Sequence, residues 1–492
     1  RCPRGAALAG RPRCARAARV APSAASGWAG PSLPSFINFL LARAVSGVGE
    51  AAYQCIVPPY IEDIAPPRLR GLCLSFFFCA VPVGTALGYE YGALVSRRGS
   101  WGWAFFGEAL FMTPLTAAVF MLPSAAVLRA RGAGSAARLS TPLLPSISSS
   151  VNGSGTAPPP LPAPRAKPST EADEQSFLDV LATLLLNPVY VCLALGYAAQ
   201  CATVLALSTF GPDIMIGFGS FTTQADAALG FAVAVSAGGL IGTPCGGLFA
   251  DRLVERSLRR IRCGQPGGGR AAAATTLTST DGGPAPALAD AQPESPLPPK
   301  RELSRTNDLA DSVEAATLSG LVVALMSIAL ILMGAAAYIA PVHELRDTFL
   351  VLIGLGVCFN FSTTAPIVRL AMLISPSSVR SLALAVMTFI MHAFGDVPSP
   401  VLIGLVKDTL APDCGVANSS QPIDCSGGGP EPPVLPCTGK ARDGLHTTIF
   451  LAILWSGWAV LLWGIAHHVL RRRAHSRLAS GAARMASVAT DE

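Results

Sequence analysis

Two charged residues lie inside an otherwise apolar segment near the start of the chain. Arg43 and Glu50 are seven residues apart in the run from Pro31 to Ile61. On an α-helix this spacing places both on one face, about 10 Å apart along the axis. A charge inside a bilayer is costly and is therefore a candidate for function. Arg43 could bind an anion and Glu50 could exchange a proton; the alternative is an ion pair that only holds helices together.

A histidine and an aspartate form a second candidate pair late in the chain. His392 and Asp396 are four residues apart in an apolar run, so they share one face of a helix. The unperturbed pKa of histidine suits His392 to carrying a proton, although a polar contact between helices explains the pair equally well. Pro398 and Pro400 follow directly and are expected to break this helix. Broken helices often border the binding sites of transporters.

Other polar residues in apolar runs have weaker claims to function. Asn360 and Thr363 could line a cavity, although such side chains also bond between membrane helices routinely. Arg369 falls near the end of its run, where it is expected to snorkel to the membrane surface.

Small residues and a terminal charge pair predict contacts that change during function. Gly84, Gly88 and Gly92 repeat every fourth residue, a spacing that lets a neighbouring helix approach closely. Asp251 and Arg252 end another apolar run. Asp251 could pair with a basic group or a helix end, and Arg252 could help to fix the orientation of the helix in the membrane. Such a pair could hold the cytosolic side closed.

The elements that must position these residues are membrane-spanning helices. Of the 492 residues, 51% are hydrophobic and only 13% are charged, against about 25% in soluble domains. Nine runs are long enough to cross a bilayer and lack the period-two alternation of transmembrane strands. They are 31–61, 72–95, 101–128, 187–212, 227–250, 315–342, 348–368, 381–406 and 447–466. The sequence therefore predicts an all-α polytopic membrane protein.

The distribution of basic residues predicts the orientation. If the loop that contains Arg68 and Arg70 is cytosolic, the cytosolic loops and tail hold 22 Lys and Arg residues. The opposite side then holds far fewer, a ratio of roughly four to one. The net charge of +6 therefore requires no nucleic-acid partner.

Composition also predicts how the chain is organised. Two segments rich in Ser, Pro, Ala and Gly cannot bury enough surface to fold alone and are expected to be disordered cytosolic linkers. An apolar stretch at 177–186 is expected to form an interfacial helix. The expected parts are an atypical segment 1–30, the rest of an N-terminal bundle 31–129, a linker 130–176, a C-terminal six-helix bundle 177–256 and 308–470, a loop 257–307 and a tail 471–492.

Motifs of soluble enzymes and cofactor sites are absent from the sequence. It contains no P-loop, nucleophile elbow, zinc-protease motif or zinc-ligand spacing, so we expect no enzyme, nucleotide, metal or cofactor. Most cysteines lie in apolar runs, where Cys behaves as a small hydrophobic residue. Cys414, Cys425 and Cys437 share a polar loop, and one disulfide could form there in an oxidising lumen.

Three motifs resemble the spinster family of the major facilitator superfamily. Leu41–Ala51, with its Gly-Glu-Ala ending, looks like the fourth helix of that family. Arg70–Tyr89 resembles its fifth helix, and the block from Arg380 through His-Ala-Phe-Gly-Asp to Ser-Pro-Val-Leu-Ile-Gly resembles its eleventh. Generic members of the superfamily share the Arg and glycines of the fourth helix, whereas its Gly-Glu-Ala ending and the His-x-x-Gly-Asp-x-x-Ser-Pro block of the eleventh helix are much more particular.

The resemblance implies helices four to twelve of a twelve-helix fold, with the first two to three helices missing from an N-terminally incomplete chain. It implies proton-coupled transport of lysophospholipids or sphingoid lipids, such as sphingosine 1-phosphate, at endolysosomal or plasma membranes. Arg43 would meet the phosphate, Glu50 would carry or sense the proton, and an apolar wall would hold the chain. Two alternatives stay open: a porter for a small organic anion or sugar acid, and a membrane sensor or scaffold that does not transport.

Overall fold

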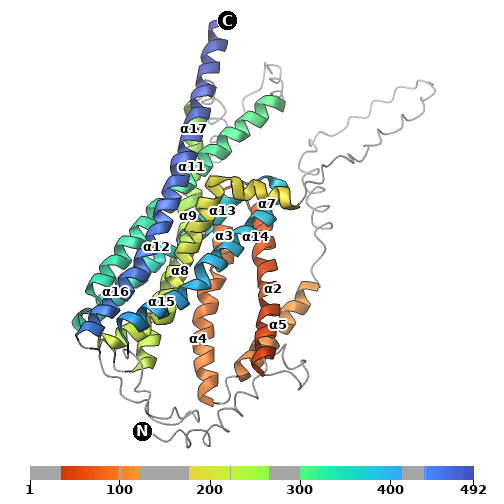
Figure 1. Ribbon diagram of the computed structural model, residues 1–492. Coiled ribbons are helices and arrows are strands. Elements are labelled where there is room, and N and C mark those ends of the chain that lie inside the picture. The colour runs from red at the N-terminus through yellow and green to blue at the C-terminus, as the bar shows by residue number, and fades with distance from the viewer. Residues whose placement is uncertain are drawn as a thin grey trace, which may run out of the picture. The chain divides into compact units, whose positions relative to one another are not determined.

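A computed structural model describes residues 35–98, 102–120, 177–221, 223–264, 300–412, 437 and 439–491. Within these ranges all regular structure is helical (Figure 1). The described part confirms the all-α fold. The predicted segment 1–30, the linker 130–176 and the cysteines at 414 and 425 lie outside it.

The helices follow one another with short connections in most of the described ranges. The first are α2 (Ser35–Ile64), α3 (Arg70–Phe78), α4 (Ala80–Arg98), α5 (Gly102–Phe120) and α7 (Phe177–Leu186). The next are α8 (Pro188–Gly217), α9 (Gln224–Gly264), α11 (Lys300–Ile339), η2 (His343–Leu345), α12 (Arg346–Phe361) and α13 (Thr364–Leu373). The last are η3 (Ser377–Val379), α14 (Arg380–Met391), η4 (His392–Asp396), α15 (Pro398–Leu410), α16 (Lys440–Leu454) and α17 (Gly457–Asp491).

Seven segments of the described residues are long and apolar enough to cross a membrane. They are 70–88, 188–217, 226–261, 308–339, 343–373, 380–410 and 440–480, and each overlaps one predicted span. The first and third predicted spans are also helical, as α2 and α5, but do not belong to these seven. Helix α2 carries four charged residues, Arg43, Glu50, Glu62 and Asp63, and the prolines Pro58 and Pro59.

Several helices extend beyond the predicted membrane boundaries into charged sequence. Helix α9 continues to Gly264 and α11 begins at Lys300, so both ends of the predicted loop 257–307 are helical. Ion pairing on the surface supports such an extension: Arg259 Nη2 lies 2.7 Å from Glu255 Oε1, one turn earlier. The middle of that loop lies outside the described residues.

Contacts divide the chain into two compact units. The first comprises residues 1–42 and 99–179, and the second comprises 43–98 and 180–492. In the first unit, the rings of Phe39 and Phe105 meet edge to face with 5.6 Å between centroids. The second unit contains all the candidate residues from Arg43 onward. Residues 43–98, which we assigned to the N-terminal bundle, therefore belong to the same compact unit as the later helices.

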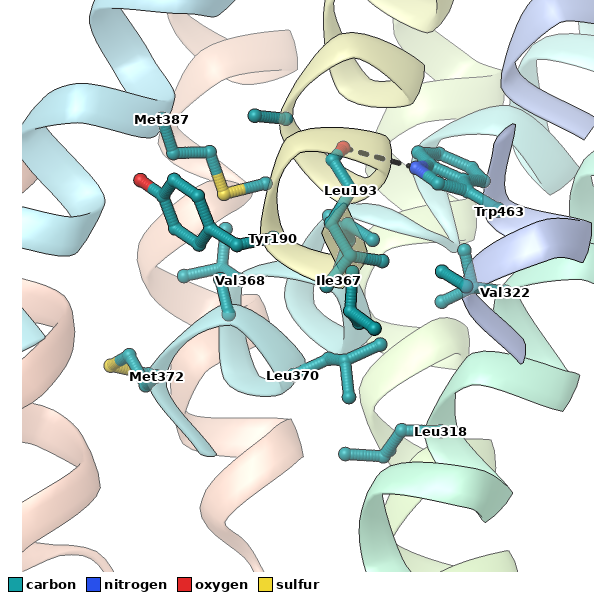
Figure 2. Close-up of a cluster of buried hydrophobic side chains, with 14 of the residues drawn as sticks. Tyr190, Leu193, Leu318, Val322, Ile367, Val368, Leu370, Met372, Met387 and Trp463 are labelled. Atoms are coloured by element: carbon teal, nitrogen blue, oxygen red, sulfur yellow. Dashed lines mark hydrogen bonds between the residues drawn. The ribbon is translucent and has the colours of Figure 1, made fainter. Parts of the chain in front are cut away.

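The core of the second unit is an apolar cluster between α8, α11, α13, α14 and α17 (Figure 2). Tyr190 and Leu193 of α8 are almost wholly buried in it, as is Trp463 of α17. The Trp463 indole N–H donates a hydrogen bond of 3.1 Å to the Leu193 carbonyl. Only a glycine fits at position 196, because a Cβ there would collide with the Trp463 ring. This cluster fixes α8 and α13, which position the candidate sites.

Close helix packing occurs on α9 rather than at the glycines that we singled out on α4. A Cβ added at Gly238 or Gly242 would collide with backbone atoms of α12, and one at Gly246 with the backbone of Ser362 directly after it. At Gly84 and Gly88 an added Cβ would meet no described atom within 4 Å. The repeat on α9 has the same four-residue spacing, so the sequence contained the signal for it.

Candidate functional site

Arg369 is held in the interior by a helix that is buried on all sides. Every residue of α13 from Thr364 to Met372 is buried, and Arg369 itself is only 2% exposed. Its neighbours Val368 and Leu370 point into the apolar cluster (Figure 2). Our expectation that Arg369 snorkels to the membrane surface is therefore wrong, because packing around α13 leaves its side chain no route to the surface.

Three carboxylates from three other helices surround the Arg369 guanidinium. Nη1 lies 2.8 Å from Asp251 Oδ1 of α9, and Nη2 lies 2.6 Å from Glu314 Oε1 of α11. Nε lies 3.6 Å from Glu62 Oε1 at the end of α2. Sequence reasoning missed Glu62 and Glu314. Both are acids at the polar end of a long apolar helix, which was the available signal.

Asp251 also caps the start of α3. Its two carboxylate oxygens accept hydrogen bonds of 2.9 Å from the backbone N–H groups of Gly71 and Leu72. The free N–H groups of a helix N-terminus favour an anion at this position. The predicted contact of Asp251 with a basic group or a helix end is present in both forms. Arg252, the other residue of the predicted pair, is exposed.

We call Glu62, Asp251, Glu314 and Arg369 the Arg369 cluster. Another basic residue, Arg70, also pairs with one of its carboxylates. Arg70 Nη1 lies 3.6 Å from Glu62 Oε1. Charge pairs taken out of water are stable only when each charge keeps its partner. The cluster therefore ties the ends of α2 and α3 to α9, α11 and α13, at the end of the helices that the basic-residue bias predicts to be cytosolic.

His392 and Asp396 meet in a π-helical turn. His392 Nδ1 lies 2.8 Å from Asp396 Oδ2, and the side chains are 45% and 26% exposed. The chain stays helical from Arg380 to Leu410, so the expected break at Pro398 does not occur. The wider turn, closed by the Val397 N–H on the His392 carbonyl at 2.9 Å, absorbs the proline instead. Pro398 then stands at the start of α15, where its missing N–H costs nothing.

The π-turn is held against α8 by a glycine. A Cβ at Gly395 would lie 2.5 Å from the Ala198 carbonyl oxygen, so only glycine allows this approach. The His392 imidazole is within electrostatic range of the Glu50 carboxylate as well as that of Asp396. Glu50 and the His392–Asp396 pair, which are distant in sequence, are thus within electrostatic range of each other.

An apolar cavity of about 250 Å³ adjoins the π-turn. Helices α8, α15 and α16 enclose it together with the Phe394 side of η4. Among the described residues that line it, the polar side-chain groups are the Ser399 hydroxyl and the Trp455 indole N–H. Phe394, Leu402 and Trp455 are 60%, 46% and 45% exposed, so the rim of the cavity is open and apolar. This shape and lining suit a hydrocarbon chain.

The remaining predicted residues divide between surface and interior. Arg43 and Glu50 are exposed on α2, and Glu50 accepts a hydrogen bond of 3.0 Å from the Gln54 amide. Asn360 is buried, and Gln200 donates to its side-chain oxygen at 2.8 Å. Thr363 donates to the Asn360 carbonyl at 2.7 Å. Asn360 and Thr363 thus belong to hydrogen bonds within and between helices and do not line the cavity described above.

Cys437 is the one cysteine of the predicted luminal loop that lies in the described part of the chain. It forms a disulfide, and its backbone N–H donates a hydrogen bond of 2.8 Å to the Gly217 carbonyl at the end of α8.

Comparison with known proteins gives a consistent set of relatives. Residues 13–283 match the family model of the Major Facilitator Superfamily. The chain is 24% identical over 390 residues to "Probable sphingolipid transporter spinster homolog 3" of Arabidopsis thaliana, covering 76% of this chain and 60% of that protein. It is 26% identical over 234 residues to "Protein spinster" of Drosophila melanogaster, covering 46% of this chain and 33% of that protein.

A shorter match has higher identity. Over 70 residues the chain is 41% identical to "Sphingosine-1-phosphate transporter SPNS2" of Xenopus tropicalis, which is 14% of each chain. The chain spans about 60% of the length of the Arabidopsis relatives that it matches. The seven apolar helices and these matches identify a multi-pass integral membrane protein.

Proposed function

We propose that the chain works as a secondary active transporter. It belongs to the major facilitator superfamily. Its relatives include several spinster proteins. Its substrate in this proposal is a lysophospholipid or sphingoid lipid, and its transport is coupled to protons. The names of the relatives support a sphingolipid substrate, and the site supports an amphipathic one.

One observation carries the choice of a lipid over a small polar anion. The π-turn η4 bears the half-exposed His392–Asp396 pair and also contributes Phe394 to the open apolar cavity. A titratable polar group thus adjoins a wall of hydrocarbon. A sugar acid or small carboxylate would leave such a cavity empty, whereas a single-chain lipid fills it with its tail.

The charged residues then take separate roles. Arg43 binds the anionic headgroup through its planar guanidinium, which suits phosphate oxygens. Glu50 carries or senses the proton, and His392 with Asp396 relays it, since Glu50 is within electrostatic range of His392.

The Arg369 cluster serves as the cytosolic gate in this proposal. It joins α2 and α3 to α9, α11 and α13 through buried ion pairs. Opening that side requires these pairs to separate and to become hydrated, so the cluster favours the state in which the cytosolic side is closed. Arg252 stays exposed beside it and orients the end of α9.

The test is uptake of a labelled lysophospholipid by proteoliposomes that contain the full-length protein, with and without a proton gradient. Arg43→Ala should abolish substrate binding, and Arg43→Lys should restore only part of it because Lys lacks the two-pronged donor. Glu50→Gln should keep lipid binding but flatten its dependence on pH. Arg256→Ala, at another exposed helical arginine, is the matched control.

Folded Arg43→Ala and Glu50→Gln variants with normal uptake and normal pH dependence would contradict these roles. Uptake of a small carboxylate but not of lipid would favour the organic-anion porter. No uptake of either by a folded protein would favour a sensor or scaffold.

A further inference from the structure

Glu62 has the weakest contacts of the three acids in the Arg369 cluster. Asp251 accepts two backbone hydrogen bonds from α3 and lies 2.8 Å from Arg369 Nη1, and Glu314 lies 2.6 Å from Arg369 Nη2. Glu62 Oε1 lies 3.6 Å from both Arg369 Nε and Arg70 Nη1, which is too far for a hydrogen bond. Glu62 Oε2 is buried and has no hydrogen-bond partner among the described residues. Because Glu62 is only 9% exposed, its negative charge is poorly compensated.

The charges around Glu62 do not balance. The charged groups that face it come from five other helices: Arg70 of α3, Asp251 of α9, Glu314 of α11, Arg369 of α13 and Arg380 of α14. Arg380 lies 3.9 Å from Asp63, the exposed acid that follows Glu62, and is paired there. The three carboxylates of the Arg369 cluster then face two guanidinium groups, those of Arg369 and Arg70. Carboxylates that share a buried site in this way favour the uptake of a proton by one of them.

Burial determines which state of the gate binds that proton. Glu62 lies just past the predicted span 31–61, and burial raises the pKa of its carboxyl, an effect larger than the lowering by Arg369, Arg70 and Arg380. Opening of the gate hydrates Glu62 and returns its pKa towards the ordinary value. The closed gate therefore binds the proton more tightly than the open gate does. Lower pH favours the closed gate, and opening releases the proton.

From this geometry we infer that Glu62 is a proton-binding site of the cytosolic gate: its carboxylate takes up a proton when the Arg369 cluster assembles and releases it to the cytosol when the gate opens. Uptake forms one O–H bond on the Glu62 carboxylate and removes one negative charge. Both cations keep a favourable environment, since Arg369 remains paired with Asp251 and Glu314 and the Arg70 side chain is 35% exposed. The inference rests on the proposed role of the cluster as a gate. It adds a site of proton release to the proton-carrying roles of Glu50 and His392.

The position of the gate can be followed against pH in the absence of substrate. The full-length protein in nanodiscs carries two fluorophores at exposed positions, Ile64 at the end of α2 and Arg260 on α9, and energy transfer between them measures the opening. They are introduced as non-natural amino acids because the chain has 13 cysteines. In the wild-type protein, the ratio of closed to open gates should rise at least about five-fold when the pH falls from about 8 to about 5. In Glu62→Gln, which is neutral at every pH, the gate should stay closed and its dependence on pH should disappear.

Neighbouring substitutions supply the controls. Asp63→Asn removes the next acid of α2, whose side chain is 65% exposed, and should leave the wild-type pH profile unchanged. Arg70→Gln removes a cation that faces Glu62 and should move the midpoint to higher pH, because Glu62 then binds its proton more tightly. Arg68→Gln changes a nearby arginine that pairs with Glu255 instead, and should leave the midpoint where it is.

A wild-type gate that does not respond to pH would overturn the site, and so would a folded Glu62→Gln protein with the wild-type profile. If Glu62→Gln does not fold, Arg70→Gln decides: an unshifted midpoint overturns the site. The proposed function fails separately. If the gate closes at low pH through Glu62 but the wild-type protein shows no proton-dependent lipid uptake, the site stands and the transport proposal falls. If that uptake is present and Glu62→Gln keeps the wild-type pH profile of the gate, the transport proposal stands and the site falls.

Discussion

At the scale of single residues, the most constrained side chain is Arg369. The residue is 2% exposed, and its guanidinium contacts Asp251 and Glu314 at 2.8 and 2.6 Å. The positive charge of this guanidinium helps to neutralise these two carboxylates and that of Glu62. A buried pair of this kind adds little net stability over an apolar substitute, but removing one partner leaves the other charge buried and alone.

Arg369→Gln should therefore destabilise the protein by about 3–5 kcal/mol, because three carboxylates would remain without their shared cation. The thermal unfolding midpoint in detergent measures the effect. Arg256→Gln, at an exposed position of α9, should change the free energy of unfolding by no more than about 0.5 kcal/mol. Adding Glu314→Gln to Arg369→Gln should recover part of the loss, since one unpaired charge is removed. An Arg369→Gln protein as stable as the control would show that the cluster is hydrated.

At the scale of elements, the contact between α9 and α12 depends on glycine. Gly238, Gly242 and Gly246 let the backbones approach so closely that any Cβ would collide with the carbonyl groups opposite. Membrane helices gain stability from such close packing because lipid supplies no hydrophobic drive between them. The π-turn uses the same device at Gly395 against Ala198.

Gly242→Val should disrupt this contact, since two or more atoms would have to occupy space already filled by the Cys358 backbone. We expect a loss of about 1–3 kcal/mol or failure to fold, measured as the yield of monodisperse protein. Gly84→Val makes the same change on α4, where an added Cβ meets no described atom within 4 Å, and should be tolerated. Equal damage from both changes would mean that the glycine stripe of α4 packs against a segment outside the described residues.

At the scale of the whole molecule, the distribution of basic residues predicts which ends of the helices are cytosolic. The Arg369 cluster and the basic extensions of α9 and α17 lie at ends that share this assignment, whereas the Cys437 disulfide lies at ends predicted to be luminal. The chemistry of each side thus agrees with its assigned compartment.

Accessibility of inserted tags tests this orientation. Antibodies should not reach tags near Ser150 and after Arg473 in intact cells and should reach them once the membrane is permeabilised. Both positions belong to the predicted cytosolic side. A tag near Gly428 should be labelled at the surface or protected inside the lumen, according to the membrane that the protein occupies. Finding Gly428 and Ser150 on the same side would overturn the predicted number of spans between them.

Much of the fold could be predicted because it depends on properties of short segments. A bilayer requires about 20 apolar residues per helix, so the runs that became α8, α9, α11 and α12 were visible without any knowledge of their neighbours. The i to i+4 spacing of His392 and Asp396 placed them together for the same local reason, and their contact at 2.8 Å agrees with it. The family motifs are also contiguous stretches of sequence.

Tertiary structure alone decided the partners of Arg369 and the position of the cavity. Asp251 and Arg369 are 118 residues apart, and no local pattern connects them. Whether an arginine near a helix end snorkels or is buried depends on what packs around it, and α13 is covered on every side. Likewise, the choice between a broken helix and a π-turn before Pro398 was made by the approach of Gly395 to α8. A sequence determines which segments enter the membrane, but the interactions among their side chains depend on how the helices pack.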